Sequence, residues 1–83
     1  MKSKKEIERN LANVILHTIE LDNYEICKGS QFEEIPGWDS LNHAKIILAI
    51  NTYFSIKIKN IEVLECKTIG DLQNLVYKRL DSK

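Results

Sequence analysis

The chain has 83 residues and a balanced charge, with 12 basic and 12 acidic side chains. A length of this order predicts one domain, spanning residues 1–83, with a thin hydrophobic core. The charge balance gives no electrostatic reason to expect a nucleic-acid-binding protein, which normally shows a basic stripe. No apolar run reaches the roughly 20 residues that span a bilayer. We therefore expect a cytoplasmic monomer that binds neither nucleic acid nor a membrane.

The cysteines and histidines are too few and too scattered to suggest a metal site. Cys27 and Cys66 lie far apart, and His17 and His43 stand apart from them and from each other. A structural zinc site needs four clustered ligands, and a disulfide scaffold needs more cysteines. We expect two reduced thiols, with Cys66 as a small core residue. Catalytic constellations such as a Cys–His pair or a glycine-rich phosphate loop are also absent from the sequence, so we do not expect an enzyme.

The first helix is predicted to begin at Ser3 and to end between His17 and Glu20. Ser3 and Glu6 have the spacing of a capping box, in which the two side chains satisfy free backbone N–H groups. Apolar side chains then recur at the spacing of one helix face. These are Ile7, Leu11, Val14 and Ile15.

A long loop over residues 21–38 follows the first helix. Gly29-Ser30 and Pro36-Gly37 are turn signals within it, and no clean hydrophobic period survives. A loop of this length in so small a domain is expected to have inner packing or a function. Its apolar residues should pin it to the helices. They are Tyr24, Ile26, Phe32, Ile35 and Trp38.

The second helix is predicted to begin at Asp39-Ser40, where either side chain can cap the free N–H groups. It should end near Tyr53 or Phe54. Four of its apolar residues recur at helical spacing and are interpreted as one stripe, and two further apolar residues widen that stripe. The stripe comprises Leu41, Ala44, Ile47 and Leu48, and the widening residues are Ile50 and Phe54.

Residues 55–59 (SIKIK) alternate apolar and polar side chains, but the chain offers no partner strand, so we predict an extended loop. A short helical turn around residues 60–66 comes next. The last helix begins at Thr68, where Thr68 and Asp71 have the spacing of a second cap. Its apolar stripe comprises Ile69, Leu72, Leu75, Val76 and Leu80.

Together these elements predict an all-α fold: a small four-helix bundle of three main helices and one short helix, with a long first loop. The order and spacing resemble the acyl carrier proteins over nearly the whole chain. The triplet Asp-Ser-Leu is weak evidence alone, but it is strong at a helix start with the later residues in register. The resemblance is carried by GWDSL at residues 37–41, by Phe54, Ile56 and Ile58, and by TIGDL at residues 68–72.

In that family the serine of the triplet is the attachment point of 4′-phosphopantetheine, which comes from coenzyme A. The resemblance places this group on Ser40, with Asp39 and Leu41 completing the cofactor-binding triplet. A phosphodiester on Ser40 would carry negative charge at a helix N-terminus, where the dipole and free N–H groups favour an anion. The alternative role of Ser40 is that of a plain helix cap.

The resemblance implies a carrier that holds an acyl or aminoacyl group as a thioester and presents it to partner enzymes. The implied partners are a phosphopantetheinyl transferase and the ligases or synthases that load the arm. Candidate partner contacts are Asn42, His43 and Lys45, with a solvated side chain as the alternative for His43 and Lys45. The family shelters acyl chains between the second and short helices. The candidates for that cleft, or for ordinary core, are Ile46, Ile47, Ile50, Val63, Leu64, Cys66 and Ile69.

The second helix departs from the carriers of fatty acid synthesis. Those carriers present a row of carboxylates that basic patches on partner enzymes read, whereas residues 41–54 contain no Asp or Glu. Complementary charge governs which partners meet and how fast. We therefore predict a specialised biosynthetic pathway in place of bulk fatty acid synthesis. Two alternatives stay open: a peptidyl or aminoacyl carrier, and an unmodified helical adaptor that binds a partner protein.

Overall fold

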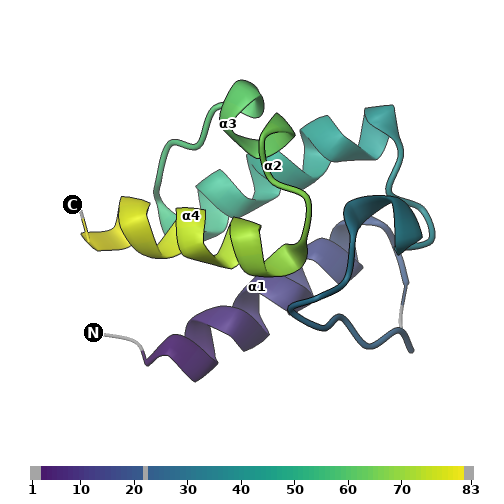
Figure 1. Cartoon of the computed structure of the whole chain (residues 1–83), viewed down its shortest axis with the longest axis horizontal. Coiled ribbons are helices and arrows are strands. Elements are labelled where there is room, and N and C mark those ends of the chain that lie inside the picture. Colours follow the sequence, from purple (N-terminus) through teal and green to yellow (C-terminus); the bar gives the residue numbers. More distant parts are fainter. Residues whose placement is uncertain (1–2, 22, 82–83) are drawn as a thin grey trace.

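The computed structural model describes residues 3–21 and 23–81, so residues 1–2, 22 and 82–83 lie outside the description. Its elements follow in chain order: α1 (Lys4–Thr18), the 3₁₀ turn η1 (Phe32–Glu34), α2 (Ser40–Phe54), α3 (Asn60–Leu64) and α4 (Ile69–Asp81). α1 packs against α2 and α4 (Figure 1). The short α3 and the start of α2 line one pocket. The predicted all-α bundle is confirmed. No helix in the described residues is long and apolar enough to cross a bilayer.

Short polar side chains set where the first two main helices begin. Ser3 Oγ accepts a hydrogen bond from the Glu6 N–H at 3.2 Å, at the start of α1. Asp39 Oδ1 accepts from the Asn42 N–H at 2.8 Å, at the start of α2. Such caps satisfy donors that have no partner inside the helix. α2 ends at Phe54, because the next residue, Ser55, has a left-handed φ of 55° that stops the helix.

The cap of α4 is reciprocal, as its sequence spacing predicts. Thr68 Oγ1 accepts from the Asp71 N–H at 3.3 Å. The Asp71 carboxylate in turn accepts from the N–H groups of Lys67 at 3.0 Å and Thr68 at 3.3 Å. These backbone hydrogen bonds, the one from Lys67 foremost, lower the pKa of Asp71 below its ordinary value.

The lowered pKa makes Asp71 a source of pH-dependent stability. A depressed folded-state pKa contributes stability that is present above the pKa of the unfolded chain and is lost as the pH falls through the folded pKa. We therefore expect Asp71→Asn to be less stable than the wild type at pH 7, with a smaller loss of stability between about pH 5 and pH 2. Urea unfolding at both pH limits measures this difference. Equal pH dependence in the two proteins would contradict the prediction.

The hydrophobic core draws on every helix and on the loops after α1 and α2. The predicted stripes on α1 and α4 contribute side chains to this core. Ile35 of the first loop is buried in it, and the other predicted anchors of that loop are partly buried against it. These predictions are therefore confirmed. The buried apolar residues are Ile7, Leu11, Ile15, Ile35, Ile46, Ile47, Ile50, Phe54, Ile56, Ile58, Val63, Ile69, Leu72 and Val76.

The predicted stripe on α2 is only partly right: Ile47 and the two widening residues, Ile50 and Phe54, are buried, but the other three residues are not. Leu41 and Leu48 are each 68% exposed, and Ala44 is exposed as well. The reason is that α2 carries apolar side chains around most of its circumference, so the period alone does not choose a face. Contact with the neighbouring helices chooses it. The face that is buried comprises Ile46, Ile47, Ile50 and Phe54.

The long first loop is also held by backbone contacts that the sequence did not predict. Gln31 forms an isolated antiparallel bridge with Thr68. Nearby, the Gly70 N–H donates to the Lys28 carbonyl at 2.8 Å. A Cβ at Gly70 would lie 3.1 Å from that carbonyl oxygen, so the close approach favours glycine. The loop is therefore tied to the start of α4 (Figure 1).

Residues 55–59 form the predicted extended loop, and one side chain takes the place of a partner strand. Asn51 Nδ2 donates to the Ile58 carbonyl at 3.1 Å, and Asn51 Oδ1 accepts from the Ile58 N–H at 2.9 Å. Backbone groups that are removed from water need such partners. Asn51 thus lets the loop bury Ile56 and Ile58 against the core, a role that sequence analysis missed.

Candidate functional site

Ser40 lies at the point where the first loop becomes α2. The turn before it contains Gly37, whose φ of 87° is a left-handed conformation that glycine adopts without strain. The Trp38 N–H closes this turn onto the Ile35 carbonyl at 3.1 Å. Ser40 is the first residue of the helix and is exposed. Its hydroxyl is therefore accessible to another molecule.

The start of α2 suits a negatively charged group on Ser40. The first helical hydrogen bond runs from the His43 N–H to the Asp39 carbonyl at 2.8 Å. The N–H groups of Ser40 and Leu41 therefore have no partner within the helix. The helix dipole adds partial positive charge at the same place. The backbone thus fits a phosphodiester on Ser40 Oγ, while the Asp39 carboxylate is engaged by the Asn42 N–H.

An aromatic cluster stands beside Ser40. The indole of Trp38 stacks on Phe32 with ring centroids 4.5 Å apart and planes 4° apart. Trp38 Nε1–H donates to His43 Nδ1 at 3.1 Å, which leaves the imidazole proton on Nε2. That Nε2 is buried and has no hydrogen-bond partner among the described residues. The alternative of a freely solvated His43 is therefore wrong, because the loop before α2 folds the indole against it.

A pocket of about 500 Å³ opens between this cluster and α3. The aromatic cluster forms one wall, α3 and the residues after it form another, and Ser40 lies among the lining residues. The pocket brings Ser40 together with three predicted cleft residues: Val63, Leu64 and Cys66.

The chain is similar to known proteins over nearly its whole length. The polyketide biosynthesis acyl-carrier-protein AcpK of Bacillus subtilis is 30% identical over 82 residues, which is 99% of this chain and 99% of that protein. The chain belongs to the acyl carrier protein family. The acyl carrier protein of Thermotoga maritima is 21% identical over 80 residues, or 96% of this chain and 99% of that one.

The fold of this acyl carrier protein agrees with its family. The solution structure of the holo acyl carrier protein from Geobacter metallireducens matches with a TM-score of 0.83 and 26% identity, over 92% of this chain and 87% of that chain. No family model matches the chain. The resemblance in the sequence is confirmed, and the function is that of an acyl carrier.

The predicted cleft residues of this acyl carrier protein divide into two groups. Val63 lines the pocket from a buried position, and Leu64 lines it while remaining 72% exposed. The four isoleucines among the candidates are buried members of the core. They are Ile46, Ile47, Ile50 and Ile69.

Cys66 is half-buried at the pocket, so the prediction that it belongs to the core is wrong. Its S–H donates to the Glu62 carbonyl oxygen, with 3.6 Å between Sγ and that oxygen. Burial, followed by the charges of Asp71, Glu65 and Glu62, raises the pKa of this thiol. A raised pKa disfavours the thiolate, which is the nucleophilic form.

Of the three candidate partner contacts, two have structural contacts of their own. Asn42 Nδ2 donates to the Gly37 carbonyl at 2.7 Å and so ties α2 to the turn before it. His43 is engaged by Trp38. Lys45 is exposed, and none of the ion pairs in the described residues includes it. Lys45 is therefore the candidate whose polar group is left for another molecule.

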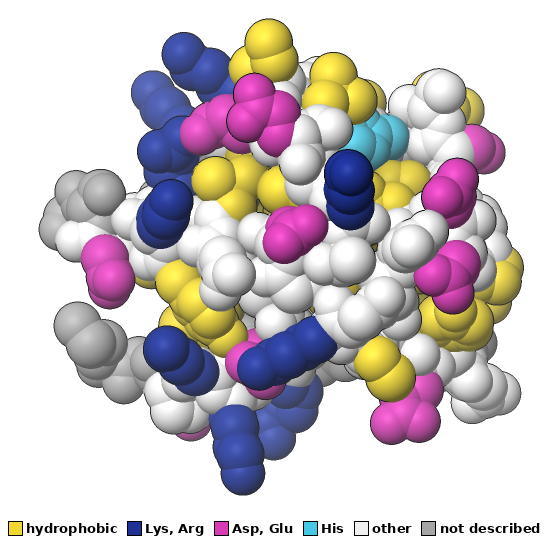
Figure 2. Space-filling model, in the orientation of Figure 1, with side chains coloured by type: hydrophobic (Ala, Val, Ile, Leu, Met, Phe, Trp, Pro, Cys, Tyr) yellow, Lys and Arg dark blue, Asp and Glu magenta, His cyan; other side chains and the backbone are white. Residues whose placement is uncertain are grey.

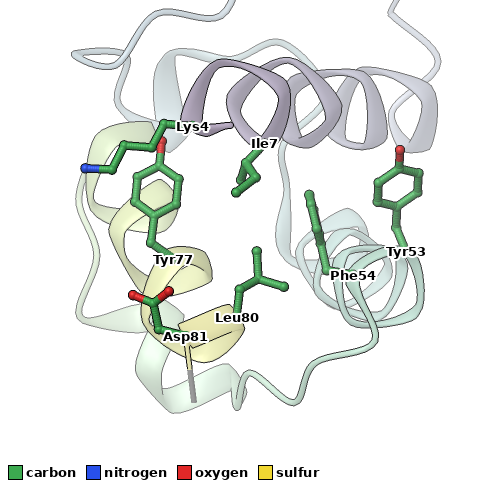
Figure 3. A pocket seen from close by; sticks show the side chains of 7 residues that line it. All are labelled: Lys4, Ile7, Tyr53, Phe54, Tyr77, Leu80 and Asp81. Atoms are coloured by element: carbon green, nitrogen blue, oxygen red, sulfur yellow. The ribbon is translucent and has the colours of Figure 1, made fainter. Parts of the chain in front are cut away.

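A second pocket, of about 410 Å³, lies at the opposite end of α2 and was not predicted. Ile7, Phe54 and Leu80 point toward its centre, and Lys4 and Tyr77 stand on one side (Figure 3). A helix rises about 1.5 Å per residue, so the length of α2 separates this pocket from Ser40 by roughly 20 Å. The pocket beside Ser40 is therefore the relevant one for a group attached there.

Proposed function

We propose that this protein is a single-domain carrier that bears 4′-phosphopantetheine, derived from coenzyme A, on Ser40 Oγ. When bound, the group supplies a thiol that holds an acyl cargo as a thioester. The observation that carries the proposal is the position of Ser40: exposed, first in α2, and within Asp39-Ser40-Leu41 at the edge of a pocket. The chain acts as a carrier, and enzymes supply the chemistry.

Each residue of the triplet has a separate role in this proposal. Ser40 provides the oxygen for the phosphodiester, and the free N–H groups at the helix start stabilise its negative charge. Asp39 keeps the helix start in place by accepting the Asn42 N–H. Leu41 is exposed beside the attachment point and is available to an enzyme. A phosphopantetheinyl transferase supplies the base and the coenzyme.

We further propose that the carrier serves a specialised biosynthetic pathway in the cytoplasm. Two observations support this part. Residues 41–54 of α2 contain no Asp or Glu, so a basic docking patch gains no attraction from this helix. The relative from Bacillus subtilis, 30% identical, is named for polyketide biosynthesis. Ligases or synthases of such a pathway would load and unload the arm.

Intact-mass measurement tests the attachment site. Incubation with coenzyme A, Mg²⁺ and a broad-specificity phosphopantetheinyl transferase is expected to add the mass of one phosphopantetheine to the wild type. Ser40→Ala should gain nothing. The matched control is Ser3→Ala, which also removes a serine hydroxyl from a helix start but should still be modified.

The outcome is decisive when circular dichroism shows that each variant is folded. A gain in Ser40→Ala would place the arm on another residue. No gain in any of the three proteins with several transferases would contradict the carrier proposal and favour an unmodified adaptor.

A further inference from the structure

One exposed stripe of α2 begins beside Ser40 and has no role in the fold. Leu41, Lys45 and Leu48 are spaced by four and then three residues, so they lie on the same side of the helix. Both leucines are 68% exposed, and Lys45 is exposed between them. The core is built from the other side of α2. The stripe therefore presents two apolar side chains with a cation between them.

The short helix α3 also carries exposed apolar side chains. Ile61 and Leu64 are 66% and 72% exposed, and Leu64 lines the pocket that contains Ser40. Figure 2 shows hydrophobic side chains at the upper edge of the molecule, over α3, with acidic side chains beside them. Isolated exposed leucines are ordinary in small proteins, but several of them near the proposed attachment point mark an interaction surface.

The α2 part of this surface lacks the carboxylates expected of carriers in fatty acid synthesis. Residues 41–54 contribute one lysine and no carboxylate. No ion pair in the described part of the chain neutralises Lys45. A second copy of the chain would bring the same cation to this face with no acid on α2 to meet it. A basic enzyme surface would meet the same repulsion.

We propose that Leu41, Lys45, Leu48 and Leu64 form the docking face for enzymes whose matching surface has an apolar recess and a carboxylate opposite Lys45. This inference rests on the proposed function, because docking matters only if Ser40 carries an arm that must reach the active site of another protein. It assigns a partner chemistry opposite in sign to the basic patches that read acidic carriers. Asn42 and His43 do not take part in this charge contact, because their polar groups bind Gly37 and Trp38 within the chain.

Charge reversal on both sides of the contact tests this face. The probes are a phosphopantetheinyl transferase with a basic docking patch and a variant of it in which those basic residues are changed to Glu. The kcat/KM for modification of Ser40 is measured by intact mass at low and high salt. The carriers are the wild type, Lys45→Glu and Lys5→Glu, which makes the same change on an exposed residue of α1.

Relative to the wild type, Lys45→Glu should raise kcat/KM at least about threefold with the basic transferase and lower it by a similar factor with the acidic variant. Both changes should shrink at high salt, because surface charges are screened. Lys5→Glu should stay within about twofold of the wild type with either transferase. Comparing ratios cancels any loss of intrinsic activity in the altered transferase.

The apolar part of the face is tested by Leu48→Ala, which should lower kcat/KM with both transferases. Equal kcat/KM values for Lys45→Glu and Lys5→Glu would overturn the proposed role of the Lys45 charge. A kcat/KM for Leu48→Ala equal to that of the wild type would overturn the proposed role of the exposed leucines. These results differ from failure of the proposed function, in which even the wild type is not modified by either transferase.

Discussion

Replacing Leu72 with alanine is expected to lower the free energy of unfolding by about 3 kcal/mol. Leu72 lies on α4 and is 0% exposed, among the most deeply buried side chains. Removing its methyl groups costs the transfer energy of the lost surface and leaves a cavity that a close-packed core fills only partly. Total stabilities of small proteins are about 5–15 kcal/mol, so the loss would be a large fraction. Urea unfolding followed by circular dichroism measures it.

The matched control is Leu48→Ala, the same substitution on a helix at a position that is 68% exposed. Alanine is a good helix former, and surface substitutions usually change stability by less than about 0.5 kcal/mol. A loss of less than about 1 kcal/mol for Leu72→Ala, or a comparable loss for Leu48→Ala, would contradict the assignment of the buried faces.

Asn51→Ala is expected to cost about 2–3 kcal/mol. The substitution removes both hydrogen bonds between the Asn51 amide and the backbone of Ile58. Ile58 is 5% exposed, so its N–H and carbonyl would be left poorly solvated. Leaving a buried donor or acceptor without a partner costs more than the net value of the hydrogen bond itself.

Two further variants separate this effect from helix propensity and from size. Asn74→Ala makes the same change at an exposed position of α4 and should be neutral or slightly stabilising. Asn51→Asp keeps an acceptor for the Ile58 N–H but loses the donor to the Ile58 carbonyl. This variant should therefore also be less stable than the wild type, as Asn51→Ala is. Thermal unfolding compares the four proteins. A neutral Asn51→Ala would show that the loop of residues 55–59 does not depend on this amide.

The helix caps and the buried faces of α1 and α4 were predictable because they depend on residues that are close together in the sequence. Ser3 and Thr68 each act on backbone groups within three residues, so their spacing alone indicates the start of a helix. The stripes of α1 and α4 are bounded by charged residues, which leaves one apolar face to bury. The position of Ser40 was predictable for the same reason, because Asp39 caps the helix on which it lies.

The face of α2 was not predictable from its period. Ile46, Ile47, Leu48 and Ile50 are equally apolar, and only packing against the neighbouring helices decides that Leu48 is the one left exposed. The role of His43 depends in the same way on the turn at Gly37, which directs the indole of Trp38 back onto the imidazole.

By itself the sequence determined the helices, their caps, the loop anchors and the serine at the start of α2, because those features depend on side chains and backbone a few residues apart. The tertiary structure alone decided which side of α2 is buried and that Asn51 replaces a partner strand. It also decided that Leu41, Lys45 and Leu48 remain exposed beside Ser40. Burial is a property of neighbouring elements, and a helix that is apolar on several sides does not specify which side they cover.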